Sequence, residues 1–384
     1  MSDSSLRVCI VLGTRPEAIK LAPVIRAFQR DPVIQTQVVL TGQHREMVDQ
    51  VMALFDLKAD ADLAIMQPQQ TLTDITCRSL QGLEAYFQAH RPELVIVQGD
   101  TTTAFAAALA AFYQKIPVGH VEAGLRTDNI YSPYPEEANR RLISQLTTLH
   151  FAPTTTAVGH LKAAGVVGEI HHTGNTVIDA LLTVADQNPD CPIDGLDWDQ
   201  HRVLLATVHR RENWGSPLND IAAGFLAILD AQPDTALLLP LHRNPVVQGP
   251  LSQLLGGHPR VFLSDPLDYR RLVGAMSRCH LLLTDSGGLQ EEAPGLGKPV
   301  LVLRDTTERP EAVDAGTARL IGTDAEAISR NALELLTDDA AYGAMARAVN
   351  PFGDGHAAER ILALVKAHYL QPATTQAWRD TPLA

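Results

Sequence analysis

Three carboxylates in the first half of the chain stand at the ends of apolar, strand-like runs or at the start of a helical stretch. Asp100 follows the run from Leu94, Glu122 follows the run from Pro117, and Glu136 opens the next helical stretch. Because the carboxyl ends of parallel strands meet at one edge of a sheet, we expect the three side chains to converge. Carboxylates that share a partly desolvated cleft can divide acid and base roles between them. The pattern therefore predicts proton-transfer chemistry.

A structural interpretation of the same residues stays open at this point. Asp100 and Glu136 could cap helices, which is a common use of acidic residues, and Glu122 could pair with the nearby Arg126. Each explanation is adequate for one residue taken alone. The recurrence of acids just past strand ends favours the chemical interpretation.

Two cationic side chains follow the first strand-like run, Val8 to Leu12, in the segment GTRPEAIK. Arg15 offers a planar fork of donors and Lys20 a point charge, and both suit a diphosphate. Pro16 and Glu17 are typical of the first turn of a helix. This segment predicts a strand, a charged loop and a helix that together face an anion.

A glycine turn in the second half predicts a further phosphate site. The apolar run Leu281 to Leu283 stops at TDSGG, in which Gly287 and Gly288 would let a phosphate approach the unpaired N–H groups of a helix start. Ser286 adds a hydroxyl donor. Glu291 or Glu292, one turn later, suits the neutral hydroxyls of a ribose. The combination indicates a nucleotide, although an ordinary strand-to-helix turn with solvated glutamates explains the turn alone equally well.

Two histidines follow strands of the second half, each beside an arginine. His209 precedes Arg210 and His242 precedes Arg243, with no HxH or HExxH spacing. We therefore expect hydrogen-bonding and phosphate-binding roles and no metal site. The acid pair in Asp60-Ala61-Asp62 is interpreted as a solvated turn.

The composition excludes several classes of partner. The 384 residues carry 44 Asp and Glu against 31 Lys and Arg, a net charge of −13, which argues against nucleic acid or an anionic membrane as a partner. Four scattered cysteines without a CxxC pair fit a reduced, cytoplasmic protein. The N-terminus lacks the pattern of a signal peptide, and the longest apolar run is far shorter than the roughly 20 residues of a membrane span.

Strand-like and helical stretches alternate along the chain, which predicts an α/β protein with doubly wound parallel sheets. A polar, proline-bearing run at Asp186 to Asp190 reads as a linker. We expect a first domain at 1–175, a second at 176–355, and a C-terminal helix within 356–384 that joins the first domain. A ligand would then bind where the carboxyl ends of both sheets face a cleft. The other expected strands are Gln37 to Leu40, Leu94 to Val97, Leu149 to Ala152, Arg202 to Val208, Ala236 to Leu239, Val261 to Leu263 and Val300 to Leu303.

Two cofactor motifs are missing. No GxGxxG follows a strand-like run, and the glycines at Gly295 and Gly297 do not have P-loop spacing. We expect no nicotinamide or ATP cofactor.

The chain resembles the non-hydrolysing UDP-N-acetylglucosamine 2-epimerases in segments that run in family order over nearly its whole length. The signature DSGGLQEE followed by RDTTERPE is more specific than a generic glycine loop. The segments are GTRPEAIK from Gly13, TGQHREM from Thr41, QGDTTT from Gln98, HVEAGLR from His120, PEEANR from Pro135, TGNTVIDAL from Thr173, HRREN from His209, DSGGLQEEAPGLGKPVLVLRDTTERPEA from Asp285 and NPFGDG from Asn350.

This resemblance implies a glycosyltransferase-B-like pair of Rossmann-like domains, a homodimer, and reversible conversion of UDP-GlcNAc to UDP-ManNAc by elimination of UDP to 2-acetamidoglucal and re-addition. It implies Asp100, Glu122 and Glu136 as catalytic acids, with His209 beside them. The positions implied to bind UDP are Arg15, Lys20, His209, Ser286, Gly287, Gly288, Glu292 and Arg309.

The family is also known for a second UDP-GlcNAc that binds as an activator. The resemblance places it at Gln43, Arg210 and His242. Glu46 stands where a glutamine can occur, and Gln69 where an arginine can. These departures leave the catalytic positions unchanged and bear on the activator site.

Three other functions remain open on the residues. A hydrolysing relative would release free ManNAc and UDP. A glycosyltransferase of the same architecture would use one catalytic base and an acceptor groove, whereas this chain has several acids. A catalytically silent sugar-nucleotide sensor would not need Asp100, Glu122 and Glu136 intact.

Overall fold

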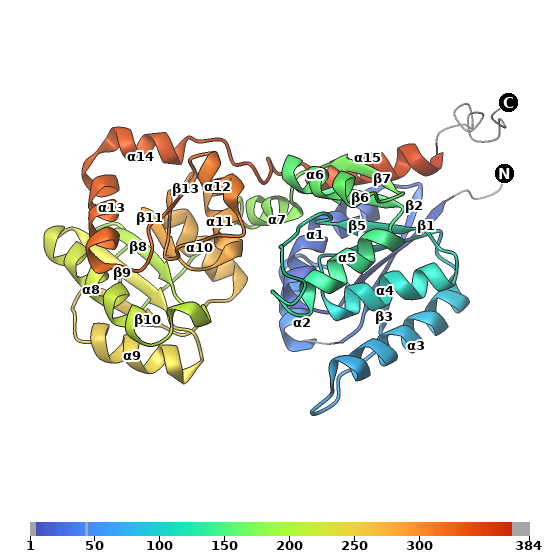
Figure 1. The fold of residues 1–384 in the computed structure, drawn as a ribbon, viewed down its shortest axis with the longest axis horizontal. Coiled ribbons are helices and arrows are strands. Elements are labelled where there is room, and N and C mark those ends of the chain that lie inside the picture. Colours follow the sequence, from blue (N-terminus) through green and yellow to red (C-terminus); the bar gives the residue numbers. More distant parts are fainter. Residues whose placement is uncertain (1–4, 43–44, 371–384) are drawn as a thin grey trace. The chain divides into compact units, whose positions relative to one another are not determined.

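The computed structural model describes residues 5–42 and 45–370, which divide into two compact units (Figure 1). The first unit runs to Asp179 and resumes at Gly355. The second unit spans Ala180–Asp354. Both are parallel-sheet α/β units, which confirms the predicted fold class of two Rossmann-like units.

The first unit is built on a parallel sheet with the strand order β3-β2-β1-β4-β5-β6-β7. The order reverses at β1, so the loops after β1 and β4 lie at the switch point where such sheets bind ligands. The strands are β1 (Leu6–Leu12), β2 (Ile34–Leu40), β3 (Ala61–Asp62), β4 (Leu94–Gln98), β5 (Val118–Val121), β6 (Leu149–Ala152) and β7 (Glu169–His172).

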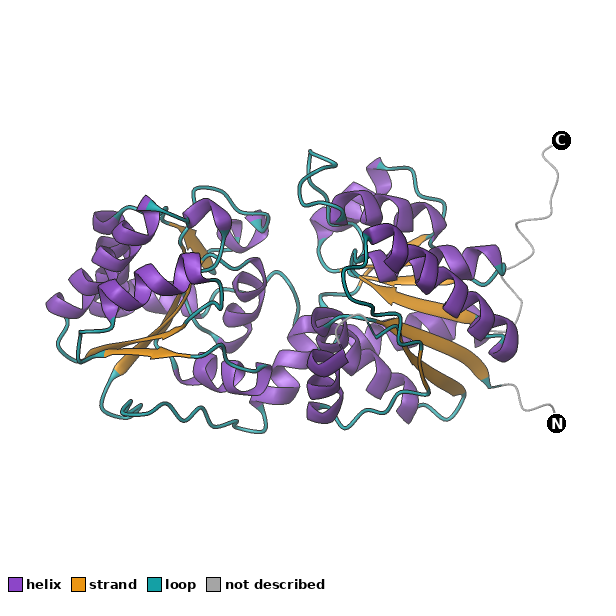
Figure 2. Cartoon of the chain, turned by 90° about the horizontal axis from the view of Figure 1, so that it is seen from below, coloured by secondary structure: helices purple, strands orange, loops and turns teal. Residues whose placement is uncertain are grey.

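Helices flank this sheet in two groups (Figure 2). In one group α3 and α5 both pack against α4, and in the other α1 packs against α2 and α15. The helices are α1 (Arg15–Arg30), α2 (Arg45–Leu54), α3 (Leu72–His90), α4 (Thr102–Tyr113), α5 (Glu136–Leu146), α6 (Thr155–Ala163) and α15 (Ala357–Leu370). A further helix, α7 (Thr176–Ala185), begins in the first unit and continues into the second.

The local sequence explains the first βα unit. β1 is almost wholly buried, as expected of a strand covered on both faces. The following helix α1 has Pro16 in its first turn and buries the apolar positions that recur at helical spacing. These are Ile19, Leu21, Val24, Ile25 and Phe28. Arg15 thus lies between a buried strand and a well-packed helix, which fix the position of its backbone.

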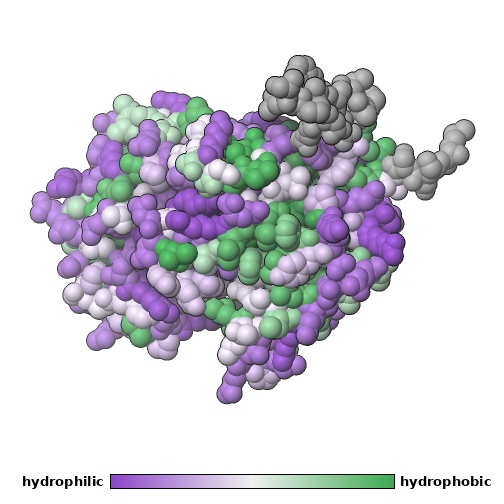
Figure 3. All heavy atoms as spheres, turned by 45° about the vertical axis from the view of Figure 1, so that its right-hand side comes forward, coloured by the Kyte–Doolittle hydropathy of each residue, from purple (hydrophilic) through white to green (hydrophobic). Residues whose placement is uncertain are grey.

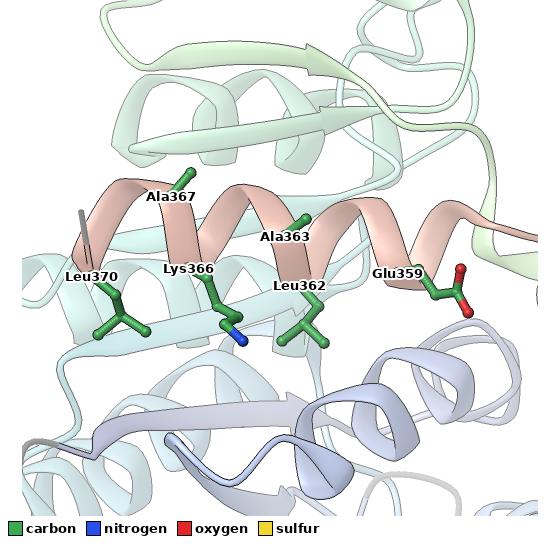
Figure 4. A pocket seen from close by; sticks show the side chains of 6 residues that line it. All are labelled: Glu359, Leu362, Ala363, Lys366, Ala367 and Leu370. Carbon is green, nitrogen blue, oxygen red and sulfur yellow. The ribbon is translucent and has the colours of Figure 1, made fainter.

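The C-terminal helix α15 completes the first unit. It packs along α1, and Lys366 Nζ lies 2.6 Å from Asp31 Oδ2. Leu362, Lys366 and Leu370 point to the same side of this helix, where they line a shallow groove (Figure 4). At the start of α15, Ala358 N donates to Asp179 Oδ1 at 2.8 Å.

The second unit repeats the pattern with the strand order β10-β9-β8-β11-β12-β13, all parallel. Its strands are β8 (Arg202–Thr207), β9 (Thr235–Pro240), β10 (Val261–Ser264), β11 (Leu281–Thr284), β12 (Val300–Val302) and β13 (Ala318–Leu320). Its helices are η1 (Arg211–Asn213), α8 (Ser216–Ala231), α9 (Pro245–Leu255), α10 (Tyr269–Arg278), α11 (Gly287–Glu292), η2 (Ala293–Leu296), α12 (Pro310–Asp314), α13 (Ala325–Thr337) and α14 (Asp339–Ala346).

One local prediction was wrong. Ala61 and Asp62 form the edge strand β3 against β2, not a solvated turn. Asp60, just before it, accepts a hydrogen bond from Val38 N at 2.7 Å. A two-residue strand leaves no periodic pattern from which it could be recognised.

The face drawn in Figure 3 shows polar side chains interrupted by apolar patches, as is usual for a folded chain in water. Among the described residues, none of the helices combines the length and the apolar character that crossing a bilayer requires.

Candidate active site

Glu122 lies immediately after β5 and is almost fully buried. Its Oε1 lies 2.5 Å from Lys20 Nζ, and Asn175 Nδ2 donates to the same oxygen at 3.4 Å. Gln98, the last residue of β4, donates a short hydrogen bond to Oε2. The backbone of Glu122 has φ +63°, a left-handed conformation that is costly for a residue with a side chain. The carboxylate is therefore held from several sides at a strained strand end.

This arrangement settles the alternative role of Glu122. Arg126 does not pair with it but donates to Leu125 O and Ser144 Oγ, at 2.7 and 2.9 Å. The cation beside Glu122 is Lys20, from the helix after β1. The structure thus brings together two predicted site residues.

Asp100 lies between β4 and α4 and is bound by α5. Arg140 Nε donates to its carboxylate at 3.1 Å, and Asn139 Nδ2 donates to its carbonyl oxygen at 2.9 Å. It does not cap α4, because Thr101 fills that role by accepting from Ala104 N. The Asp100 carboxylate keeps a quarter of its side-chain surface exposed, so it remains accessible to a ligand.

Glu136 is the first residue of α5 and shares a helix face with Asn139 and Arg140, the two residues that hold Asp100. It is not the cap of α5, since Pro135 occupies that position. Within the described part of the chain, the Glu136 side chain makes no hydrogen bond or ion pair. A partly exposed acid is therefore placed on the Asp100 side of the helix.

Glu17 is a site residue that the sequence analysis assigned only to a helix start. It is 2% exposed and accepts from Gly13 N at 2.8 Å, Thr14 N at 2.6 Å and Thr101 Oγ1 at 2.5 Å. Burial raises the pKa of Glu17 above its usual value, against the lowering effect of these hydrogen bonds. Glu17 ties the loop after β1 to the loop after β4, so it fixes the base of Arg15 relative to Asp100. The T-x-x-E spacing of a capping box was the available signal.

His120 supports the same edge of the sheet from within. This fully buried residue of β5 has Nε2 2.7 Å from Gly99 O, next to Asp100. Burial lowers the pKa of His120 to about 4. The ring is therefore neutral at pH 7, with Nε2 donating to the Gly99 carbonyl.

In the second unit, His209 follows β8 and meets the buried carboxylate of Asp285. His209 Nδ1 lies 2.9 Å from Asp285 Oδ1, and the His209 side chain is about one-third exposed. The ring stacks beside that of His242, with centroids 6.0 Å apart. Two histidines predicted from separate strand ends are therefore neighbours.

The glycine turn lies where predicted, at the start of the short helix α11. Ser286 is its N-terminal cap residue, and Ser286 N donates to Thr284 Oγ1 at 2.9 Å. A Cβ atom on Gly287 would lie 3.4 Å from Arg210 Nη2, whereas one on Gly288 would meet no protein atom within 4 Å. The turn is open at Gly288 and crowded by a cation at Gly287.

The ion pairs behind this turn involve Arg210 and Arg304. Arg210 Nη1 lies 3.7 Å from Glu308 Oε1, and Arg304 Nη1 lies 2.8 Å from Glu308 Oε2. Burial opposes ionisation of Glu308, but hydrogen bonding and charge from Arg304 outweigh it and lower the pKa to about 2. Glu308 is thus a carboxylate that holds both cations in place.

The two glutamates of α11 have different partners. Glu291 forms a short ion pair with Arg309, and Glu292 accepts from the Tyr269 hydroxyl at 3.0 Å. Both are buried. Arg309, a predicted UDP ligand, thus has its guanidinium against an acid of the same unit.

One predicted site residue, Gln43, lies outside the described residues. The other two positions of the expected activator site, Arg210 and His242, lie in the second unit as given above. Among the described residues, no group of three or more His, Cys, Asp or Glu side chains is placed to hold a metal ion.

Comparison with known proteins shows the family of the chain. A family model described as UDP-N-acetylglucosamine 2-epimerase matches residues 26–366. The chain is 50% identical over 373 residues to the UDP-N-acetylglucosamine 2-epimerase of Escherichia coli K12, covering 94% of this chain and 98% of that protein. The chain belongs to the UDP-N-acetylglucosamine 2-epimerase family. The resemblance found in the sequence motifs is thereby confirmed.

Solved structures of the family extend the comparison. The epimerase of Neisseria meningitidis, bound to UDP-GlcNAc, has 47% identity and a TM-score of 0.84 over 94% of this chain and 100% of that one. The epimerase of Methanocaldococcus jannaschii, in complex with UDP-GlcNAc and UDP, has 32% identity and a TM-score of 0.75, with 94% and 100% covered. This epimerase-family chain therefore shares its architecture with proteins that bind the sugar nucleotide and its UDP part.

Proposed function

We propose that this chain is a non-hydrolysing UDP-N-acetylglucosamine 2-epimerase that interconverts UDP-GlcNAc and UDP-ManNAc. The observation that carries the proposal is the set of acids at the carboxyl edge of the first sheet, with Glu122 held by Lys20, Gln98 and Asn175. Family membership supplies the substrate class, since relatives bind UDP-GlcNAc and UDP.

The proposed reaction is an elimination followed by re-addition. The C1–O bond to UDP breaks, the C2 proton is taken by a carboxylate, and 2-acetamidoglucal and UDP result. UDP then re-adds to C1 while a proton is delivered to the opposite face of C2, so atoms and charges balance over the cycle. Loss of UDP makes the ring oxocarbenium-like, which acidifies a C2 proton that no neighbouring carbonyl activates.

The residues divide between the two halves of this chemistry. We assign proton removal and return to Asp100, Glu122 and Glu136, each at a strand end or helix start of the first unit. We assign the stabilisation of negative charge on the departing diphosphate to cationic side chains and hydrogen-bond donors. These come from Arg15, Lys20, His209, Arg309 and the turn at Ser286, Gly287 and Gly288. Glu292 is assigned to the ribose. Arg210, His242 and Gln43 are assigned to a second UDP-GlcNAc.

Two further properties complete the proposal. All four cysteines are free thiols, three of them buried, which supports a reducing cytoplasmic location. The chain acts as a homodimer in this proposal. Exposed apolar side chains on the adjacent helices α4 and α5, namely Phe112, Tyr113 and Leu142, support such an interface. Light scattering coupled to size exclusion should give a mass near twice 41.6 kDa.

The decisive test is incubation with UDP-GlcNAc in deuterated water, followed by NMR. We expect deuterium at C2 of both UDP-GlcNAc and UDP-ManNAc, with no net release of sugar. Accumulation of free ManNAc and UDP would instead show a hydrolysing enzyme. A protein that binds UDP-GlcNAc without exchanging the C2 proton would be a sensor.

The same assay tests the acid assignment. Asp100→Asn should bind UDP with near wild-type affinity, since the amide keeps the shape of the side chain, and should fail to exchange the C2 proton. Wild-type turnover in this variant would remove Asp100 from the mechanism. Titration of the variant with UDP by calorimetry supplies the binding control.

A further inference from the structure

Asp285 is a buried carboxylate whose side-chain contacts are with one short segment, His209 to Asn213. It follows β11 and is fully inaccessible to solvent. Its Oδ2 accepts from His209 N at 2.9 Å, Arg210 N at 2.8 Å and Asn213 Nδ2 at 3.0 Å. Its Oδ1 faces the ring of His209, 2.9 Å from Nδ1. One carboxylate therefore holds both the backbone and the side chain of His209.

The charge on Asp285 is retained despite its burial. Burial alone would raise the pKa of this carboxyl, but the His209 side chain and the backbone N–H groups of His209 and Arg210 bring the pKa below its usual value. The group is thus an anion at pH 7. A buried anion is stabilised by nearby positive or donor groups, and His209 Nδ1 faces Oδ1 at 2.9 Å as an ion-pair contact.

The contact fixes the tautomer of His209. An ionised carboxylate only accepts hydrogen bonds, so the ring proton must be on Nδ1. With its own backbone N–H bound to the same carboxylate, the ring has two anchors, and the stack against His242 limits its rotation. Nε2 is left as the ring atom available to a ligand.

We infer that Asp285 is a positioning residue for the reaction, which holds His209 by Nδ1 and so directs the opposite ring atom, Nε2, toward the bound nucleotide. The inference rests on the proposed function and adds the residue that orients His209. Asp285 itself touches no reacting atom. It acts only through His209, whereas Asp100, Glu122 and Glu136 are assigned to the sugar.

The first experiment reads the ring directly in the wild-type protein, without substrate. Histidine labelled with ¹⁵N gives distinct NMR signals for protonated and bare ring nitrogens, and His209→Gln identifies the signals of His209. We expect a protonated Nδ1 on His209 at pH 7. A neutral ring with its proton on Nε2 alone overturns the inference, whatever the variants do.

The second experiment compares two variants that disturb the same carboxylate. Asp285→Asn should lower kcat about 100-fold with KM changed less than about threefold. A His209 ring that is no longer held in place matters most in the transition state, when negative charge develops on the departing diphosphate. The His209 ring signals should shift in this variant. Asn213→Ala removes a donor from Oδ2 but leaves the Nδ1 contact, and should lower kcat less than about tenfold.

Equal losses of kcat in the two variants would mean that Asp285 only braces the loop, and would overturn the inference. If Asp285→Asn does not fold, the wild-type ring signals decide the question. Failure of the proposed function is separate: it appears as a wild-type protein that incorporates no deuterium at C2.

Discussion

Lys20 Nζ lies 2.5 Å from Glu122 Oε1, although 102 positions separate the two residues in the chain. Lys20 comes from the helix after β1, and Glu122 from the end of β5. Their pairing joins a cation predicted to face a diphosphate to an acid predicted to move a proton. A buried ion pair of this kind is sensitive to the removal of either partner.

Glu122→Gln should abolish most of the epimerase activity. The amide keeps the size of the side chain but has only one accepting oxygen for the donors Gln98 and Asn175, and it cannot take a proton, so we expect kcat to fall at least about 100-fold. UDP affinity, measured by calorimetry, should change little. The matched control is Glu93→Gln, which removes the acid of an exposed pair with Arg7 and should leave both quantities unchanged.

Arg140→Met should destabilise the first unit as well as reduce activity. Arg140 Nη1 lies 3.0 Å from Glu137, whose side chain is fully buried, and Arg140 also holds Asp100. Leaving these acids without their cation should cost about 3 to 5 kcal/mol of unfolding free energy in urea titrations.

Arg141→Met is the control for that measurement, since Arg141 Nε contacts the same Glu137 carboxylate at 2.6 Å but is 46% exposed. Its cost should stay below about 1 kcal/mol. Equal losses from both arginine variants would contradict the role given to Arg140.

His150 should make the protein less stable in mild acid. This residue of β6 is fully buried, and neither ring nitrogen has a hydrogen-bond partner among the described residues. Burial lowers the pKa of His150 to about 3, from an ordinary 6.5. As pH falls below 6.5 the unfolded chain binds the proton first, so stability present above pH 6.5 is lost toward the folded pKa. The loss should be about 2 kcal/mol between pH 7 and pH 5.

His150→Leu should remove that part of the pH dependence without loss of stability at pH 7, because it also removes an unpaired polar group. Urea titrations at both pH values measure the difference. The exposed His172, changed to Gln, should retain the wild-type slope. An unchanged slope in His150→Leu would mean that His150 is protonated, or hydrated, in the folded protein.

Gly288→Ala should lower the affinity for UDP and raise the free energy of unfolding. A methyl group at this position meets no protein atom, and alanine favours the helix by about 0.5 to 1 kcal/mol. If a phosphate approaches the turn there, the same methyl group blocks it, and UDP affinity should fall at least about tenfold.

The control is Gly159→Ala, a helical position in α6 that is likewise open. It should give the gain in stability without any change in UDP affinity. A Gly288→Ala protein that binds UDP as tightly as wild type would remove Gly288 from the UDP-binding set.

The sequence predicted those parts of the fold and site that depend on local pattern. β1 and α1 follow from an unbroken apolar run and a helical repeat, and Asp100 and His209 could be placed at strand ends from the runs before them. β3 was not predicted because two residues carry no period, and β13 was not predicted because Arg319 interrupts its three residues, whereas the equally short β12 is apolar throughout.

Partners distant in sequence could not be predicted in the same way. Asp285 and His209 lie 76 positions apart, and Gln98 and Glu122 lie 24 apart on different strands. Which acid meets which cation depends on strand order, and local residue types do not encode it. Hence the sequence offered its neighbour Arg126 as one possible partner of Glu122, whereas the fold pairs it with Lys20.

The first unit draws on both ends of the chain, since α15 follows the whole of the second unit and packs on α1. During synthesis, all the sequence of the nested unit is translated before the final helix of the surrounding one. A nonsense codon shortly before Gly355 would leave the glycine turn at Ser286 to Gly288 in the protein but remove α15. The face of α1 that α15 covers would then be exposed, and we expect the truncated protein to be degraded by cellular proteases.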